Sequence, residues 1–196
     1  MLSTKLLTSV AGTVLLFGAA SFASAQTIIT GETTDPLNTS TEGDIVIEAE
    51  SLAVAETDTT EAVDAVEEGV ITITNSGNIV TLDSDNSITH NGIIQAEDVD
   101  DVVGVLITGG NTGEYTGSGS ISLTETFAPE DTDESGTLDG PFAQGENRIG
   151  ILISGASPFT GNVETTGGNI IIEGNNSAAI RLDANTSITG LSLIHI

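Results

Sequence analysis

The chain has 196 residues, with 29 acidic and only 3 basic residues, no cysteine and 3% aromatic residues, and its formal net charge is −26. This charge repels nucleic acid phosphates and anionic lipids and attracts cations, so the sequence predicts no nucleic acid partner. The absence of cysteine excludes disulfides, thiolate metal sites and thiol redox chemistry.

The first 25 residues have the three parts of a secretory signal peptide. Lys5 supplies a positive n-region, residues 6–20 form an apolar h-region, and residues 23–25 (Ala-Ser-Ala) form a small-residue cleavage site. A membrane-spanning helix is the alternative, but the apolar run is interrupted by serine, threonine and glycine and is short for a span of about 20 residues. We therefore expect an exported protein whose mature chain begins at Gln26.

Short runs of β-branched residues recur from Gly43 onward and predict strands. Each run has the length of a strand and is bounded by Gly, Asn, Asp or Ser, which favour turns. Residues 60–68 come nearest to a helical pattern, but their valines and threonines equally suit a strand. Residues 26–42, before these runs, are expected to be a flexible N-terminal segment. The predicted strands are residues 44–47, 69–73, 78–82, 102–107, 120–123, 149–153, 169–172 and 179–182.

One larger sequence unit occurs about twice. Residues 82–89 (LDSDNSIT) return at 182–189 as LDANTSIT. Residues 104–110 (GVLITGG) return at 150–156 as GILISGA, and each member of this second pair is followed by an aromatic-Thr-Gly step, at 115–117 and 159–161. Parallel stacking of coils explains this repetition, because each coil can bury its Ile and Val only against neighbouring coils, while Gly and Asn turn the corners. A β-sandwich is the alternative, but it gives no reason for internal repetition.

These features resemble the β-helical passenger regions of bacterial autotransporters, the type V secretion proteins. The resemblance rests on the signal peptide, the absence of cysteine, the corners at 75–77 (Asn-Ser-Gly) and 91–92 (Asn-Gly), and the repeated Leu-Asp-x-x-x-Ser-Ile-Thr strand. It covers about residues 43–190 and implies an all-β fold, a right-handed parallel β-helix or solenoid, here as an N-terminal fragment.

The resemblance also implies a location and partners. Such passengers are exported by Gram-negative bacteria and lie at the cell surface, in the outer membrane or outside the cell. They pass through a C-terminal outer-membrane β-barrel of the same chain, whose aromatic girdles have no counterpart in this sequence. Many members are adhesins, so the implied partners are surface molecules of a host or of neighbouring cells.

The last six residues, 191–196 (LSLIHI), break the turn-rich pattern that precedes them. The same hexapeptide is the translation, in one reading frame, of the mosaic-end adaptor of transposon-based sequencing libraries. We interpret these residues as an adaptor artefact appended to a gene fragment that ends near Gly190. A natural β-strand is the alternative.

The acidic stretch 128–147 is expected to be a loop inserted between repeat units. Within it, oxygen-bearing side chains at positions one, three, five and nine, with glycine at position six, match the calcium loop of EF-hands. Position twelve, normally a bidentate glutamate, is Phe142, so a solvated acidic loop is the alternative. A second acidic cluster, residues 97–101, is expected to be solvated. The candidate Ca²⁺ ligands are Asp131, Asp133, Ser135, Thr137 and Asp139.

No catalytic residue is assigned. A Ser-His-Asp site would have to use His90, which is expected to be an ordinary exposed residue at a strand-to-corner junction, and no Gly-x-Ser-x-Gly elbow surrounds any serine. A pair of carboxylates at the spacing needed for glycoside hydrolysis would be no evidence for an enzyme, because a chain with so many acidic residues contains such pairs by chance. The sequence therefore predicts a non-enzymatic structural or adhesive surface passenger. A β-helical carbohydrate-active enzyme of the cell envelope is the alternative.

Overall fold

The computed structural model describes residues 25–49 and 68–194. The predicted signal peptide, up to residue 24, and the ambiguous window 60–68, up to residue 67, lie outside the described residues. The described chain is all-β, with seventeen strands and one four-residue helix, α1 (Thr39–Glu42). Within these ranges, no helix has the length and apolar character needed to cross a bilayer.

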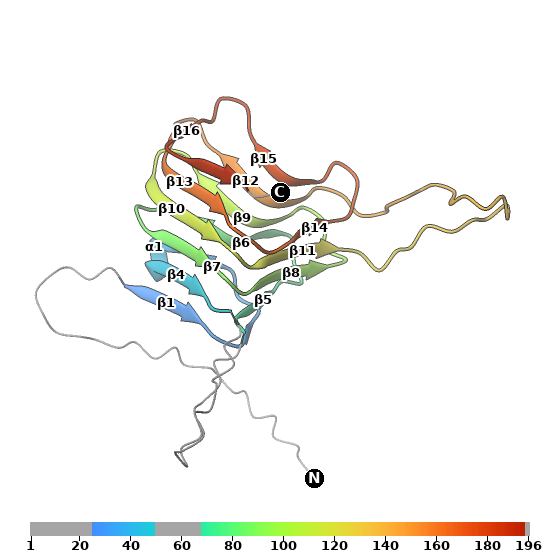
Figure 1. The fold of residues 1–196 in the computed structure, drawn as a ribbon, viewed down its shortest axis with the longest axis horizontal. Helices are drawn as coiled ribbons and strands as arrows, with labels where there is room; N and C mark the ends of the chain where they lie inside the picture. Colours follow the sequence, from blue (N-terminus) through green and yellow to red (C-terminus); the bar gives the residue numbers. More distant parts are fainter. Residues whose placement is uncertain (1–24, 50–67, 195–196) are drawn as a thin grey trace, which may run out of the picture.

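The strands wind through three sheets and return, coil after coil, to the first (Figure 1). Every paired strand runs parallel to its neighbour, which lies one coil away, so the prediction of stacked parallel coils is confirmed. Sheet A contains β1 (Gln26–Ile29), β4 (Asp44–Ile47), β7 (Ser87–His90), β10 (Thr112–Gly117), β13 (Phe159–Thr165), β16 (Ile188–Thr189) and β17 (Ser192–Ile194). Sheet B contains β2 (Glu32–Thr33), β5 (Val70–Thr72), β8 (Ile93–Glu97), β11 (Ser120–Thr124) and β14 (Ile170–Ile172). Sheet C contains β3 (Leu37–Asn38), β6 (Gly77–Leu82), β9 (Val102–Thr108), β12 (Arg148–Ser154) and β15 (Ala178–Leu182).

The repeat of residues 104–110 at 150–156 and the repeat of the aromatic step that follows have different structural bases. Residues 104–110 and 150–156 begin in β9 and β12, which are neighbours in sheet C, and Val105 lies opposite Ile151. The aromatic steps that follow are not equivalent, because the register places Tyr115 opposite Val163 and not opposite Phe159. The first similarity therefore reflects stacking, whereas the second does not.

The segment 26–42 belongs to the coil, which corrects the expectation that it is flexible. Strand β1 pairs with β4 along its whole length, and β2 and β3 pair with β5 and β6. Helix α1 is fastened to the next coil because the fully buried hydroxyl of Thr39 accepts a hydrogen bond from the Asp83 amide (3.0 Å). Strands of two to four residues are too short to show a hydrophobic period in the sequence.

Inward-facing aliphatic side chains form rows that run from coil to coil. Because side chains alternate between the two faces of a strand, every second residue of strands such as β4, β7 and β11 enters the core. Burial of these side chains removes apolar surface from water and supplies the main stabilisation of the coil. One row in each sheet, in stacking order, is Ile45, Ile88, Tyr115 and Val163; Ile71, Ile94, Ile121 and Ile170; and Val80, Val105, Ile151 and Ile180.

The apolar C-terminal residues lie on the open edge of sheet A. Strand β17 pairs with β13, and the side chains of Leu191, Leu193 and Ile194 are 52%, 49% and 42% exposed. A natural strand and an appended one can both pair with an unpaired edge. The interpretation of residues 191–196 as adaptor sequence therefore stays a prediction.

Alanine substitutions should show how much more the inward-facing rows contribute to the free energy of unfolding than the outer face does. We expect Ile88→Ala to lower the free energy of unfolding by about 2 to 5 kcal/mol, since it leaves a cavity between Ile45 and Tyr115. The matched control, Thr89→Ala, alters the next residue on the outer face of β7 and should cost far less. Urea unfolding followed by circular dichroism measures both changes, and equal costs would contradict the inward assignment of Ile88.

Candidate functional site

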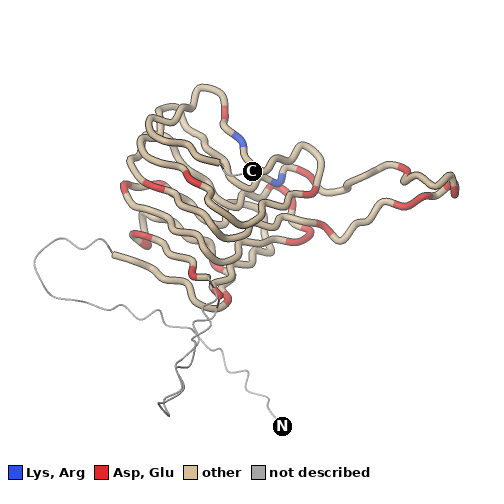
Figure 2. The backbone as a smooth tube through the Cα atoms, viewed as in Figure 1, with Lys and Arg blue, Asp and Glu red and all other residues tan. Residues whose placement is uncertain are grey.

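The segment between β11 and β12 leaves the coil at the corner between sheets B and C and projects far from it (Figure 1). It contains the insertion predicted at 128–147. Figure 2 shows that acidic residues gather at the tip of this projection and again around its base. Loops that project from a rigid scaffold commonly carry binding functions, so the acidic tip and the base of the loop are both candidate sites.

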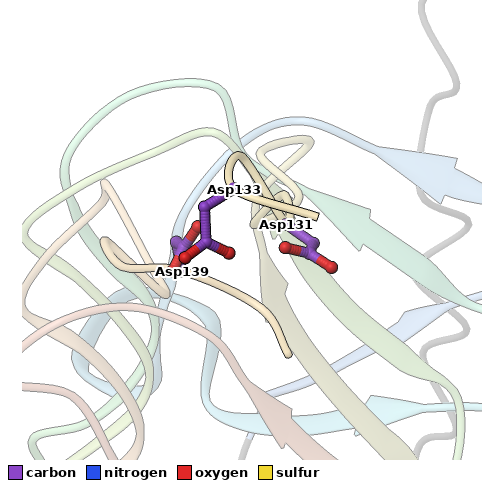
Figure 3. Close-up of side chains that lie close together, drawn as sticks. All are labelled: Asp131, Asp133 and Asp139. Carbon is purple, nitrogen blue, oxygen red and sulfur yellow. The ribbon is translucent and has the colours of Figure 1, made fainter. Parts of the chain in front are cut away.

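At the tip, the structure brings the predicted calcium ligands together. Oxygen atoms of Asp131, Asp133 and Asp139 all lie within 4.8 Å of one another, and Figure 3 shows the three carboxylates gathered at the turn of the loop. The hydroxyl oxygens of Ser135 and Thr137 are 2.9 Å apart. A ring of carboxylate and hydroxyl oxygens is the kind of ligand set that Ca²⁺ prefers.

Backbone amides hold these carboxylates in place. The Ser135 amide donates to Asp131 (3.0 Å) and Asp133 (3.1 Å), and the Gly136 amide donates to Asp131 (2.7 Å). Gly136 has a φ of 86°, which glycine adopts without strain. The loop therefore orients its carboxylates through its own backbone.

Hydrogen bonds also keep two of the carboxylates ionised. The hydroxyl and the amide of Thr132 donate to Asp139 (2.7 and 2.9 Å) and hold its pKa below the usual value. The side chain and then the amide of Ser135 lower the pKa of Asp133 in the same way. The residue at position twelve, Phe142, is 68% exposed and offers no oxygen from its side chain, so any cation held here would keep water in its coordination shell.

At the base of the loop, Arg148 is the central residue, and the sequence analysis did not single it out. Its side chain is only 2% exposed although it is charged. The guanidinium donates to the carbonyl oxygens of Val99 (2.8 Å) and Glu173 (3.0 Å), and it forms ion pairs with Asp100 and Glu125 (both 3.2 Å). Arg148 thus contacts the coils before and after its own. Its one signal in the sequence is its position, as one of two basic residues after residue 25, directly behind the acidic loop.

Glu125 joins the two ends of the loop. Its carboxylate accepts hydrogen bonds from the amides of Gln144 (3.1 Å) and Gly145 (2.6 Å) as well as from Arg148. The Gly145 amide is the main cause of a lowered pKa for Glu125, whose side chain is only 5% exposed. We call Glu125, Gly145 and Arg148 the loop clamp. The departing and returning chains are therefore fixed to each other before the loop extends into solvent.

The acidic cluster at 97–101, expected to be solvated, also makes bonds at this corner. Asp98 accepts hydrogen bonds from the amide and hydroxyl of Thr126 (both 2.8 Å), which lower its pKa, the amide more than the hydroxyl. Asp100 accepts a hydrogen bond from the Glu146 amide (2.9 Å). These carboxylates are exposed and yet serve as acceptors for the next coil. A groove of about 520 Å³ opens here, lined by Asp98, Asp100, Glu125, Thr126, Phe127, Gln144, Gly145 and Arg148.

The prediction that His90 is exposed is wrong, because its side chain points into the coil. It is 0% exposed, and its Nδ1 lies 3.1 Å from the hydroxyl oxygen of Tyr115. On the alternating faces of β7, His90 shares the inward face with Ile88. No serine or carboxylate of the described residues bonds to this imidazole, so a Ser-His-Asp arrangement is not formed around it.

Comparison of the chain with models of protein families, with curated proteins and with solved structures gave no match. Three features of the structure bear on the function of the chain. They are the parallel coil, the acidic tip of the loop and the clamp at its base.

Calcium should bind at the tip of the loop. Isothermal titration of the chain with CaCl₂ is expected to show a dissociation constant in the sub-millimolar to millimolar range, because charged oxygens are preplaced but the closing glutamate is missing. The double variant Asp131→Asn, Asp133→Asn should weaken binding, whereas Asp35→Asn, at an exposed position outside the loop, should not. A flat isotherm for the unaltered chain would end the metal hypothesis.

Removing the charge of Arg148 should destabilise the coil strongly. Arg148→Met keeps much of the packed stem but leaves Glu125 almost buried without its cation, so we expect a loss of about 3 to 5 kcal/mol in the free energy of unfolding. The control Arg181→Met removes an ion pair with Asp183 in which the side chains are 42% and 36% exposed, and should change stability by less than about 1 kcal/mol.

A second variant tests whether the loss at Arg148 comes from the unpaired carboxylate. Adding Glu125→Gln to Arg148→Met removes that charge and should recover part of the stability in the same urea titration. Equal unfolding free energies for Arg148→Met and the unaltered chain would show that the clamp is not a structural requirement.

Proposed function

We propose that the chain is a non-enzymatic passenger of a Gram-negative cell surface, of the autotransporter type, in which a right-handed parallel β-helix presents an acidic loop. In this proposal the protein is exported by its signal peptide and anchored by a C-terminal outer-membrane β-barrel of the same chain. The proposal rests on the parallel coil and on the long acidic loop that projects from its corner. A right-handed turn is what parallel crossover connections adopt in nearly all sheets.

The architecture supports a presenting role. A solenoid grows in one dimension and offers its loops along its length, so a structural or adhesive function suits it. The loop clamp fixes the base of the loop, and a fixed base reduces the entropy lost when a partner binds. The expected partners are surface molecules of a host or of neighbouring cells. Nucleic acid is not a partner in this proposal, because the net charge of −26 repels phosphate.

Calcium is the cofactor that the proposal assigns to the loop, with Asp131, Asp133, Ser135, Thr137 and Asp139 as its ligands. A divalent cation would reduce the repulsion among the three carboxylates. The loop would then present a tip that is both less charged and more ordered. Adhesion through this tip would accordingly depend on calcium.

A β-helical carbohydrate-active enzyme is the second candidate, and one observation favours it. The groove at the loop base places an aromatic ring, Phe127, beside the carboxyl groups of Asp98 and Glu125. Hydrolysis with paired carboxyl groups needs one that carries a proton near neutral pH. The pKa values of Asp98 and Glu125 are both lowered by hydrogen bonds from backbone amides, so this pair lacks the proton donor. The chemistry of the groove therefore supports the passenger more than the enzyme.

Export is the first consequence to test. When the whole chain is expressed in a Gram-negative host, mass spectrometry of the protein outside the cytoplasm should find Gln26 as its first residue. The variant Leu15→Arg, which interrupts the apolar h-region, should keep the chain in the cytoplasm. An unprocessed cytoplasmic chain without that variant would contradict the proposal.

The same purified chain separates the two candidate functions. Incubated with a panel of polysaccharides, it should release no reducing ends above buffer, and Asp98→Asn should behave identically. Hydrolysis by the unaltered chain that is lost in Asp98→Asn would replace the passenger with the enzyme.

A further inference from the structure

A buried polar pair interrupts the aliphatic core where β7 meets β10. Within the pair, His90 is 0% exposed and Tyr115 is 1% exposed, and their ring centroids are 6.4 Å apart. The imidazole Nδ1 lies 3.1 Å from the phenol oxygen. Neither the calcium loop nor the loop clamp makes use of this pair.

Glycines make room for the pair. His90 lies between Ile47 and Gly117 in the stacking register. A Cβ added to Gly117 would lie 2.6 Å from the Tyr115 hydroxyl, and one added to Gly119 would lie 2.8 Å from Nε2 of His90. A Cβ at Gly119 would also meet the Gly92 carbonyl of the preceding coil, so coil stacking requires this glycine as well. At Gly117 the three nearest atoms all belong to Tyr115, so this glycine leaves room for the phenol ring.

The second imidazole nitrogen has no hydrogen-bond partner. Among the described residues, Nε2 of His90 is the buried side-chain nitrogen or oxygen atom that lacks one. A neutral imidazole can leave one nitrogen unpaired at moderate cost. A protonated imidazole would bury a charge, which is far more costly, and the backbone at Gly92 and Ser120 offsets only part of that cost.

The surroundings offer the imidazolium no counter-charge. From β10, the titratable group that faces His90 is Tyr115, and burial raises its pKa above the usual range, so the phenol is neutral. The acidic residues of the adjacent strands, Asp44 on β4, Glu114 on β10 and Glu97 on β8, are not among the buried residues, and Asp44 instead bonds to Ser87. No ion pair of the described residues includes His90. Burial therefore dominates and lowers the pKa of His90 to about 4, with a partial opposing effect from the backbone at Gly92 and Ser120.

We propose that His90 is an acid-sensitive latch of the coil, closed while the imidazole is neutral and opened by its protonation, which separates β7 from β10. Opening gives the imidazolium access to water. The latch would open the coil when the surrounding medium becomes acidic, whether or not the chain is a surface passenger.

The direction of the pH effect follows from the two protonation states. In the open state His90 has the ordinary pKa of 6.5, and in the closed state its pKa is about 4. The open state binds the proton more tightly, so the stability of the closed coil is complete above about pH 6.5 and falls as the pH drops toward 4. Acidic side chains begin to titrate in the lower part of the same range, and their protonation reduces the repulsion within a chain of net charge −26. A variant without the imidazole is needed to separate the two effects.

The test compares the unaltered chain with His90→Gln, whose neutral amide retains a polar group but does not titrate. Urea unfolding at pH 7 and pH 4.5 should show the unfolding equilibrium constant of the unaltered chain rising roughly 50-fold more than that of His90→Gln. Hydrogen exchange of the β7 and β10 amides should accelerate in the same window. The control His195→Gln removes the other histidine of the sequence and should follow the unaltered chain.

Equal pH dependence of the two proteins would overturn the proposal. If His90→Gln does not fold, the imidazole of the unaltered chain is followed directly by NMR, with His195→Gln used to assign its signal. A signal that titrates near pH 6.5 while the β7 and β10 amides stay protected would also overturn it. A signal that stays neutral down to about pH 5 and then shifts as protection is lost would support it.

Discussion

Everything in this molecule depends on the parallel, in-register stacking of one coil on the next. Backbone N–H and C=O groups of a buried strand must be paired, and here each interior strand has its partners in the coils before and after it. The same register stacks Ile on Ile, for example Ile94 on Ile121. The step from one coil to the next therefore pairs the backbone groups and buries the apolar side chains at the same time. A shift of one residue would turn each apolar row toward solvent, and this fixes the register strongly.

Polar groups are tolerated in this scheme only where a corner or a glycine supplies their environment. Arg148 lies at the corner between sheets B and C, where carbonyl and carboxylate oxygens from neighbouring coils surround it. His90 lies within the apolar rows, and its side-chain hydrogen-bond partner is Tyr115. Burial of a polar side chain is thus made possible in two ways. The charge of Arg148 is surrounded by hydrogen-bond acceptors, whereas the imidazole of His90 is kept neutral.

The sequence predicted the architecture because stacking leaves a repeated pattern in it. The correspondence of residues 104–110 with 150–156 is a direct trace of β9 lying beside β12. Periodicity could not reveal the first coil, since β2 and β3 have two residues each, nor the inward side chain of His90, since a single polar residue beside a corner suits either face. The grouping of Asp131, Asp133 and Asp139 could be predicted because their spacing is local to one turn. The loop clamp was missed because Glu125, Gly145 and Arg148 meet only after the coils have stacked.

The clamp has a consequence for how this protein can diversify. Since Glu125 and Gly145 are tied together, the chain re-enters the coil at Arg148 in the same place whatever lies between the tied points. The strands on either side keep their alignment, with Arg148 opposite Val102 and Ile121 opposite Ile94. Closing a longer flexible segment between fixed ends adds little entropy cost, about 0.6 kcal/mol for each doubling of length. We therefore expect the coil to tolerate insertions and replacements in the projecting segment as long as Glu125, Gly145 and Arg148 are kept.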